Sequence, residues 1–479
     1  MRRFPDPKVL RAALRTKRVI NSETYLLRLG PPLLPGGSAA DGLFDLWEHY
    51  LSPGEATQGI SESDLKRVTA FFFHIDTLVS AMRSVLWRRR LFVSGDLLGD
   101  LLFDSLSEPD LILAVLQRLK ANESTTRVTL LFPLRGFGIR GAGLGPLVGA
   151  VVSVVDARRG YAFTPQTNNL QATPDFVNAT ARLLGVRATA ELDDLEHVVR
   201  SRGARWLERN PLLMISVASA SGFFYEQEFL QLGQLKTVAG ALVMISRFDP
   251  LAGGTAGSIF SSRSVNNWQT LDTNHYLMLS RRSRRSSDME VQAVPVHSRR
   301  EVLELTDLNI EFSPSSIDGT SALAPNVFRA VNQVFDGYLA NHFSDDRRRH
   351  ATGRVYAKWL ESLSYFRRSV RDEGSWESVV GLATAFEMLL TDHYAKGTAA
   401  LLHRRVTRLL RARHDRGALA SAVERVYFAR NMAVHSCQLD TSDVLAAQQA
   451  YVLCFIAIAR RRERIPMSGN DTARALTGL

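Results

Sequence analysis

The chain has 479 residues, of which 45% are hydrophobic, and a formal net charge of +11 at pH 7. This length exceeds what one hydrophobic core usually supports, so we expect two or three domains of ordinary globular composition. The positive charge favours a polyanionic partner without identifying it, because basic surfaces also meet membranes and acidic proteins. The only two cysteines, Cys437 and Cys454, exclude a disulfide framework and a four-cysteine zinc site, and they fit a reducing cytosol.

The N-terminal segment, residues 1–120, is expected to be mainly helical. Phe71, Ile75 and Val79 follow a helical apolar stripe, which is typical of a scaffold. The first residues are basic but contain no apolar stretch of signal-peptide length. No stretch of the chain reaches 18 uninterrupted apolar residues. We therefore expect a cytoplasmic protein that does not insert into a membrane.

Residues 121–320 predict a β-rich α+β domain that senses a signal or recruits a partner. Short β-rich runs are separated there by Gly, Asn, Ser and Pro. The runs are RVTLLFPL, LVGAVVSVV, PLLMISVASA, VAGALVMISRF, HYLMLS and VQAVPVH. The basic segment SRRSRRSSD at 280–288 predicts an exposed loop, with a contact to nucleic acid as the alternative.

One glycine motif in this region has the spacing of a dinucleotide-binding loop but not the sequence that should follow it. Gly136, Gly138 and Gly141 have the spacing G-x-G-x-x-G, and Asp156 follows about twenty residues after the first glycine. A dinucleotide site needs a helix next, whereas the Val-rich residues 147–155 predict a strand. We interpret the glycines as a turn. The sequence also lacks a P-loop and an H-E-x-x-H motif, so we expect no cofactor and no metal.

Residues 325–465 predict an all-helical bundle, followed by a flexible tail at 466–479. Six helices are expected, near 327–340, 352–371, 375–393, 398–413, 416–435 and 442–462. Short connections between them imply antiparallel neighbours. Between residues 345 and 464 there are 21 Lys and Arg against 13 Asp and Glu, an excess of 8 positive charges out of the total of 11. The basic character of the chain therefore belongs to this bundle.

The most informative stretch is Ala-Arg-Asn-Met-Ala-Val-His-Ser at 429–436, which places Arg430 and His435 five positions apart. An arginine can stabilise charge on a phosphate, and a histidine can move protons near neutral pH without a metal. Arg430 shares the apolar stripe of Leu419 and Val423, so it needs a partner, a crevice or a phosphate. A structural ion pair at Arg430, with a histidine facing the helix C-terminus, is the alternative that the residues leave open.

The helical phase of this stretch separates the two side chains. On a regular helix His435 lies about 140° around the axis from Arg430, whereas Asn431 lies about 40° from His435. A frayed helix end, or a second copy across a two-fold axis, would bring the arginine and the histidine together. A homodimer with a composite cleft is the more economical hypothesis.

Three segments, taken in order, resemble the Apea-like HEPN domain family of the HEPN superfamily. They are a glutamate-bearing helix with Glu387, an arginine-bearing helix with Arg405, and a Tyr-x2-Arg-Asn-x3-His helix that starts at Tyr427. The resemblance covers about a quarter of the chain and implies an all-α HEPN-type bundle. Ser436 stands where this family often has glycine.

The resemblance implies a metal-independent endoribonuclease site at a homodimer interface. Arg430 would stabilise the phosphate in the transition state, His435 would act as general base or acid, and Asn431 would position the substrate or the histidine. Tyr427, Glu387 and Arg405 would be supporting residues. Because a buried carboxylate must be paired, we expect Glu387 to form an ion pair with Arg405 or Arg430.

The expected function is that of a defence or toxin effector that cleaves RNA and leaves 2′,3′-cyclic phosphate and 5′-hydroxyl ends. The ribose 2′-hydroxyl is an internal nucleophile, so RNA is the expected substrate. The N-terminal region would take a regulatory partner. The alternatives are a non-catalytic HEPN module for dimerisation or for nucleotide or RNA binding, and a DNA-binding regulator.

Overall fold

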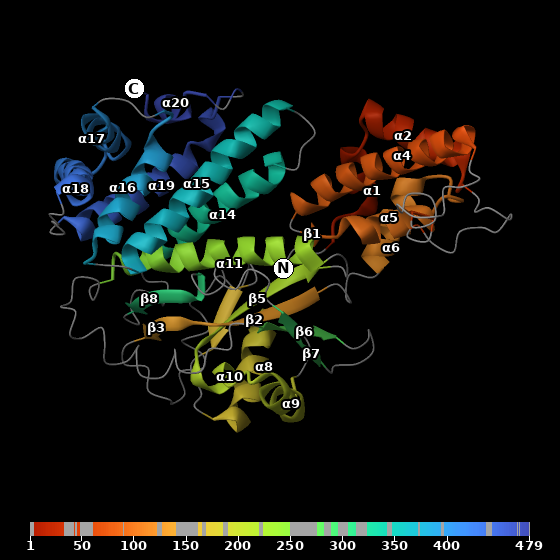
Figure 1. Ribbon diagram of the computed structural model, residues 1–479, viewed down its shortest axis with the longest axis horizontal. Helices are drawn as coiled ribbons and strands as arrows, with labels where there is room; N and C mark the ends of the chain where they lie inside the picture. The colour runs from red at the N-terminus through yellow and green to blue at the C-terminus, as the bar shows by residue number, and fades with distance from the viewer. Residues whose placement is uncertain are drawn as a thin grey trace. The chain divides into compact units, whose positions relative to one another are not determined.

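The computed structural model describes most of the chain, with gaps. The described residues are 4–32, 43, 46–47, 61–89, 91–121, 127–139, 161–164, 169–184, 190–219, 224–249, 275–281, 289–295, 305–312, 323–342, 347–371, 374–393, 397–436, 443–466, 468 and 470–478. They are mostly helical, with β-strands in the middle of the chain and an all-helical C-terminal region (Figure 1). None of the described helices has the length and apolar character that crossing a bilayer requires.

The chain divides into two compact units. The first unit comprises Met1–Val128 and Val217–Gln231, and the second comprises Thr129–Ser216 and Leu232–Leu479. In the first unit, strand β1 (Leu91–Phe92) pairs in parallel with the end of β5 (Leu212–Ser219). The helices described in the first unit are α1 (Pro7–Ala13), α2 (Lys17–Leu29), α4 (Glu62–Trp87), α5 (Gly95–Phe103) and α6 (Leu111–Ala121).

Local sequence explains where the helices of the first unit begin. The side chains of Thr16, Ser61 and Ser94 each accept a hydrogen bond from a backbone N–H in the first turn of α2, α4 and α5. Arg11 of α1 donates to Glu23 of α2 over 2.5 Å and to Asp110, just before α6, over 3.0 Å. These caps and bonds fix the ends of the described helices and join α1, α2 and the start of α6 into a helical scaffold.

The sheet of the second unit has the strand order β4-β5-β2-β6-β7, and β3 and β8 form a separate parallel pair. β4 runs antiparallel to β5, and β6 runs antiparallel to β7. The remaining bounds are β2 (Arg127–Pro133), β3 (Arg135–Ile139), β4 (Tyr161–Thr164), β6 (His275–Arg281), β7 (Met289–Pro295) and β8 (Asp307–Phe312). The middle of the chain is therefore rich in strands, as the sequence predicts.

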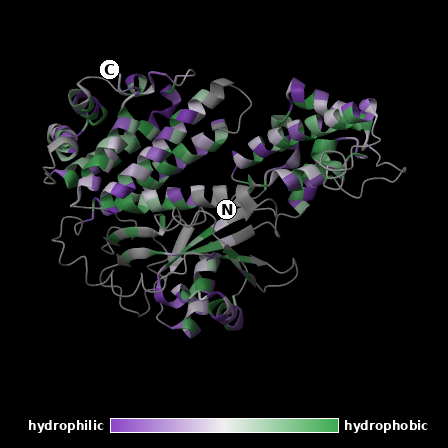
Figure 2. Ribbon diagram, viewed as in Figure 1, coloured by the Kyte–Doolittle hydropathy of each residue, from purple (hydrophilic) through white to green (hydrophobic). Residues whose placement is uncertain are grey.

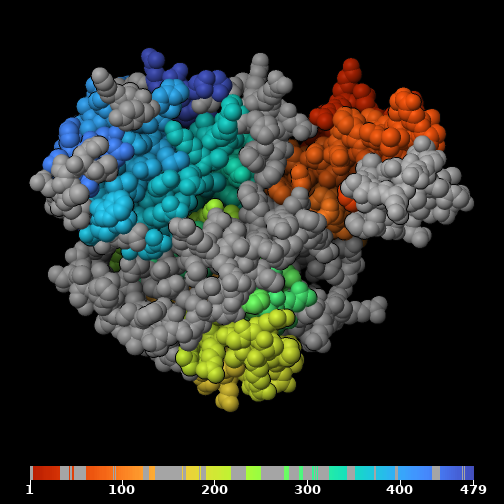
Figure 3. Space-filling view, viewed as in Figure 1, coloured from red at the N-terminus to blue at the C-terminus, as the bar shows by residue number. Residues whose placement is uncertain are grey.

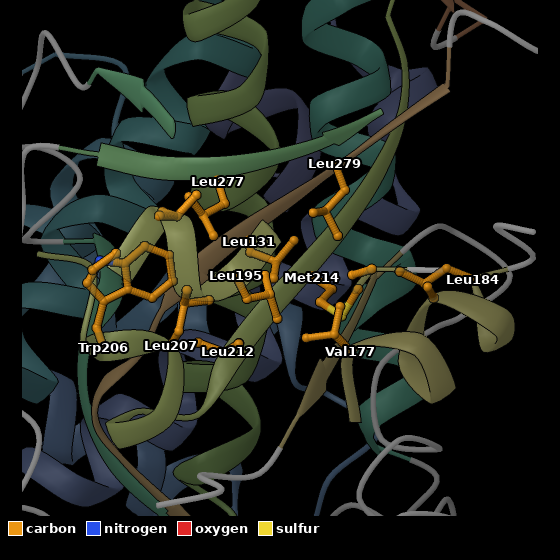
Figure 4. Close-up of a cluster of buried hydrophobic side chains, with 14 residues drawn as sticks. Leu131, Val177, Leu184, Leu195, Trp206, Leu207, Leu212, Met214, Leu277 and Leu279 are labelled. Carbon is orange, nitrogen blue, oxygen red and sulfur yellow. The ribbon is translucent and has the colours of Figure 1, made fainter. Parts of the chain in front are cut away.

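Three helices of the second unit pack against this sheet and enclose a core. They are α8 (Thr173–Leu183), α9 (Leu192–Arg202) and α10 (Trp206–Arg209), and α8 is preceded by a 3-10 turn, η3 (Leu170–Ala172). Figure 4 shows Val177 and Leu195 packing with strand residues such as Leu131 and Met214. Burial of these side chains, with Trp206, stabilises the α+β layer through the removal of apolar surface from water.

Two predictions for the middle region are wrong. The run VAGALVMISRF does not form a strand, because it lies at the end of helix α11 (Phe224–Ser246). Gly136 and Gly138 do not form a turn, because both lie in strand β3, while Gly141 and Asp156 lie outside the described residues. A continuous apolar run fits a buried helix as well as a buried strand, so periodicity could not separate the two. The run at 147–155, residues 282–288 and Cys437 lie outside the described residues.

The C-terminal region is all helical, as predicted. Its helices are α14 (Leu323–His342), α15 (Arg347–Arg371), α16 (Trp376–Leu390), α17 (Thr398–Leu409), α18 (Arg416–Ser436), α19 (Val444–Arg460), the 3-10 turn η5 (Arg462–Arg464) and α20 (Thr472–Thr477). The sequence predicted a flexible tail from residue 466, whereas this segment contains α20. The carboxylate of Asp392 accepts the backbone N–H groups of Ala473 and Arg474 over 2.7 and 3.1 Å, a long-range cap that local pattern does not reveal.

Helix α11 belongs to the same bundle by contact. Its residues from Leu235 to Ile245 are nearly all buried and apolar, and green predominates in the coloured part of α11 in Figure 2. Gly240 lies so close to Leu363 of α15 that a Cβ there would overlap the leucine. Just after the helix, Arg247 donates to the side chain of Gln448 of α19 over 3.3 Å. A helix that is apolar all round is buried on all sides, which suits a position inside a fold.

Candidate functional site

Helix α18 carries the Arg-x4-His motif and is helical throughout it. Leu419, Val423 and Val426 are buried, and α18 packs against α16, α17 and α19. The helix continues to Ser436, so Arg430 and the backbone of His435 both lie in regular helix. The helices coloured from cyan to blue, which include α15 to α18, reach the surface on the face drawn in Figure 3. Because the side chains of its apolar stripe are buried, the stripe determines which face of α18 packs against α16, α17 and α19.

Tyr427 and Glu387 form the inner part of the site. The hydroxyl of Tyr427 donates to Oε1 of Glu387 over 2.6 Å and joins α18 to α16. The pKa of Tyr427 is raised to about 12, first because the ring is buried and next because its hydroxyl bonds the carboxylate; Thr398 and Arg430 oppose the shift. The phenol is therefore a fixed hydrogen-bond donor near neutral pH.

Arg430 lies on the outer side of Tyr427. Its Cζ is 5.8 Å from the centroid of the Tyr427 ring, and its Nη1 donates to Oδ1 of Asn431 over 3.0 Å. The side chain is half-buried, so the predicted position on the apolar stripe holds only in part. A guanidinium has five N–H donors, and the described residues engage one of them by a hydrogen bond. The others can bind an anion such as phosphate.

The structure brings together four of the six predicted site residues. Glu387, Tyr427, Arg430 and Asn431 form one connected cluster on α16 and α18. The backbone of His435 lies in the last turn of α18, and its side chain lies outside the described part. Because α18 is unbroken, His435 starts about 140° around the axis from Arg430, and one copy of the helix does not present the two residues on one face.

Arg405 lies apart from this cluster, and the expected ion pair of Glu387 with Arg405 or Arg430 is wrong. Among the described residues, Glu387 is bonded by Tyr427 instead. Arg405 is buried; its Nη1 donates to the carbonyl of Leu390, and its Nη2 lies 3.9 Å from Asp392. Carbonyls at a helix C-terminus have no partner within the helix, which explains what attracts the guanidinium. Burial lowers the pKa of Arg405.

Three residues near the site were not identified from the sequence. Thr398, at the start of α17, hydrogen-bonds the Tyr427 hydroxyl. Phe428 and Met432 of α18 flank Arg430 in the chain and are 56% and 43% exposed. Phe428 and Met432 lie outside the apolar stripe of α18 on a helical wheel, and this position could have identified them as surface residues. Large exposed apolar side chains beside a polar cluster are typical of a surface that contacts another molecule.

The described side chains include no group of three or more His, Cys, Asp and Glu placed to hold a metal ion. The cluster instead offers a guanidinium, an amide and a phenol, which suit the binding of an anion through hydrogen bonds. No protein-family model, no curated protein and no solved structure matches the chain.

Proposed function

We propose that the chain is a metal-independent endoribonuclease of the HEPN type, with Arg430, Asn431 and His435 as catalytic residues. The observation that carries the proposal is the state of Arg430. Its guanidinium is half-buried and held in place by Asn431 and the Tyr427 ring, yet most of its donors are free of hydrogen bonds within the described part of the chain. An arginine preorganised in this way suits the charge of a phosphate in the transition state.

The proposed reaction is an internal transesterification of RNA. The general base, His435, removes the proton of the ribose 2′-hydroxyl, whose oxygen attacks the adjacent phosphorus as the bond to the 5′-oxygen breaks. A proton is returned to that leaving oxygen, which gives a 2′,3′-cyclic phosphate and a 5′-hydroxyl end. Arg430 neutralises the charge of the phosphorane-like state, and no water or metal is consumed in this step.

The supporting residues set the orientation of the arginine. Tyr427 is fixed by Glu387, and its ring forms one face of the Arg430 position. Asn431 accepts a hydrogen bond from Arg430 and can still donate through its amide to the substrate or to His435. Arg405 acts further away by fixing the end of α16, the helix that carries Glu387.

The proposed active form is a homodimer in which α18 meets its copy. Two observations support it: the 140° phase between Arg430 and His435 on an unbroken helix, and the exposure of Phe428 and Met432 beside the motif. A two-fold axis would pair Arg430 of one copy with His435 of the other and cover these apolar side chains.

The exposed apolar pair also favours a second candidate, a HEPN-type module that dimerises or binds RNA without cleaving it. The biological role that we propose for the enzyme is that of a cytoplasmic defence or toxin effector, in which the N-terminal region takes the activating partner. The experiment below separates turnover from binding.

The test is to incubate the purified full chain with a labelled RNA in EDTA and to follow cleavage on a gel. Arg430→Ala and His435→Ala should each lower the rate roughly 10²- to 10⁴-fold. The matched controls are Arg404→Ala and His414→Ala, at exposed positions of the same bundle, which should cleave normally.

Two further measurements test the cleavage mechanism, and the affinity for RNA tests the alternative of a non-catalytic binding module. A 2′-O-methyl group at the cut site should abolish cleavage, and the 3′ product should carry a cyclic phosphate. If all five proteins degrade RNA equally, the proposed site is wrong. If none cleaves but Arg430→Ala alone loses RNA affinity, the binding module is the better description.

A further inference from the structure

The bundle contains a pocket whose lining includes none of the residues of the Tyr427 cluster. It has a volume of about 220 Å³ and is formed by α15, the end of α16 and the segment that leads into α20. Its apolar lining comes from Val355 and Trp359 of α15 and from Met388 and Leu389 of α16. Pockets for drug-sized ligands usually measure roughly 300–1,000 Å³, so this one suits a smaller molecule.

Lys358 supplies positive charge inside the pocket. Its side chain is half-buried, and its Nζ donates to the carbonyl of Thr391 over 2.6 Å. An ammonium group has three N–H donors, so two remain after this bond. Among the described residues no carboxylate lies within 4 Å of Nζ. Burial lowers the pKa of Lys358, which Asp392 opposes, so the group would gain from a close anion.

The nearest acidic residue, Asp392, is already engaged by other groups. Its two carboxylate oxygens accept the N–H groups of Ala473 and Arg474, and one of them lies 3.9 Å from the guanidinium of Arg405. The positive end of helix α20 and a buried arginine therefore share its single charge. Lys358 therefore shares the single charge of Asp392 with Arg405 and with the first N–H groups of α20.

The rim of the pocket adds further basic groups. Arg354 and His393 line the pocket and are exposed, and the lining also contains two acidic residues, the half-buried Asp392 and the exposed Asp471. Arg354 lies one helical turn before Lys358 on α15, so the two side chains project from the same face. The pocket thus combines an apolar wall with two basic side chains placed at neighbouring positions.

We propose that this pocket binds a small organic anion, whose carboxylate or phosphate group contacts Lys358 and Arg354 and whose apolar body lies against Trp359 and Met388. The volume limits the body to about one ring. The site is separate from the RNA-cleaving proposal: Met388 lines the pocket, whereas its neighbour Glu387 bonds Tyr427 on another side of α16. Failure of one proposal therefore leaves the other intact.

The test is isothermal titration calorimetry on the full chain with benzoate, phenyl phosphate and the uncharged benzamide. At least one of the two anions should bind saturably, and which of them binds more tightly identifies the acidic group. Lys358→Met should weaken that binding at least tenfold, about 1.4 kcal/mol. Lys66→Met is the matched control, because Lys66 is exposed on α4 and pairs with Glu62 there. It should bind like the wild type.

Several results would overturn the proposal. They are the absence of saturable binding of either anion up to about 10 mM, benzamide binding as tight as that of the anions, and an unchanged Kd in Lys358→Met. If Lys358→Met does not fold, Arg354→Gln at the exposed rim replaces it. That variant should weaken binding several-fold, and an unchanged Kd would contradict the assignment equally.

Discussion

Replacing Tyr427 with phenylalanine removes one oxygen atom and, with it, the bond that joins α18 to α16. The lost hydrogen bond is short, at 2.6 Å, and its acceptor is the carboxylate of Glu387. Hydrogen bonds to charged groups contribute roughly 1.5–3 kcal/mol. Glu387 is half-buried, so water can replace part of this bond. We expect Tyr427→Phe to lower the free energy of unfolding by about 1–2 kcal/mol, because the ring itself keeps its packing.

The assay is urea unfolding of the full chain, followed by far-UV circular dichroism, with midpoints compared at constant slope. Tyr365→Phe makes the same chemical change on α15, where the described residues offer the hydroxyl no hydrogen-bond partner. This control should change the free energy of unfolding by less than about 0.5 kcal/mol. Equal effects of the two substitutions would refute the assignment of stability to the Tyr427–Glu387 bond.

A double-mutant cycle isolates the pair itself. In a Glu387→Ala background the Tyr427 hydroxyl has lost its main acceptor, so adding Tyr427→Phe should cost about 0.5 kcal/mol or less. The coupling energy expected for two contacting residues is then about 1 kcal/mol. A coupling energy near zero would mean that the two side chains act independently despite their distance.

Other predictions concern helix packing and alkaline pH. Gly337→Ala would push a methyl group into the ring of Tyr356 and should cost about 1–3 kcal/mol in urea unfolding, whereas Gly417→Ala, with open space around it, should stabilise by about 0.5 kcal/mol. If Gly337→Ala and Gly417→Ala changed the free energy of unfolding in the same direction, this packing of α14 on α15 would be contradicted. Because the pKa of Tyr427 is raised from 10 to about 12, its contribution to stability is full below pH 10 and is lost as the pH rises towards 12. The advantage of the wild type over Tyr427→Phe should therefore fall above pH 10 by up to about 1.4 kcal/mol per pH unit, and a constant difference would contradict the shift.

The helices of the C-terminal region could be predicted because each carries its own signals. The helix α16 begins after Ser375, whose hydroxyl accepts an N–H of the first turn, and α17 begins after Gly397 in a left-handed conformation. These local features leave direct traces in the sequence. The end of α11 could not be predicted, since its apolar run lacks the polar face that marks an amphipathic helix.

The candidate site was predictable as a set of residues on α16 and α18 but not as a set of bonds. Sequence phase places Glu387 on the packed side of its helix, and it says nothing about which neighbouring side chain reaches the carboxylate first. Tyr427 does so, while Arg405 turns to the free carbonyl of Leu390. Which side chain bonds Glu387 depends on the distances between neighbouring helices, and the local sequence of one helix does not reveal these distances.

Because α11 packs inside the C-terminal bundle, it determines which fragments of the chain can fold on their own. Gly233 and Gly240 of α11 lie close to Phe335 and Leu363 of the bundle, and Gln449 of α19 donates to the carbonyl of the residue that follows the helix, Arg247. A fragment that starts at Pro325 would lose this helix and present apolar side chains of α14 and α15 to water. Such a fragment should aggregate, and adding residues 232–249 as a separate peptide should restore its solubility. The bundle would then depend on a segment that the ribosome makes well before the bundle's own helices.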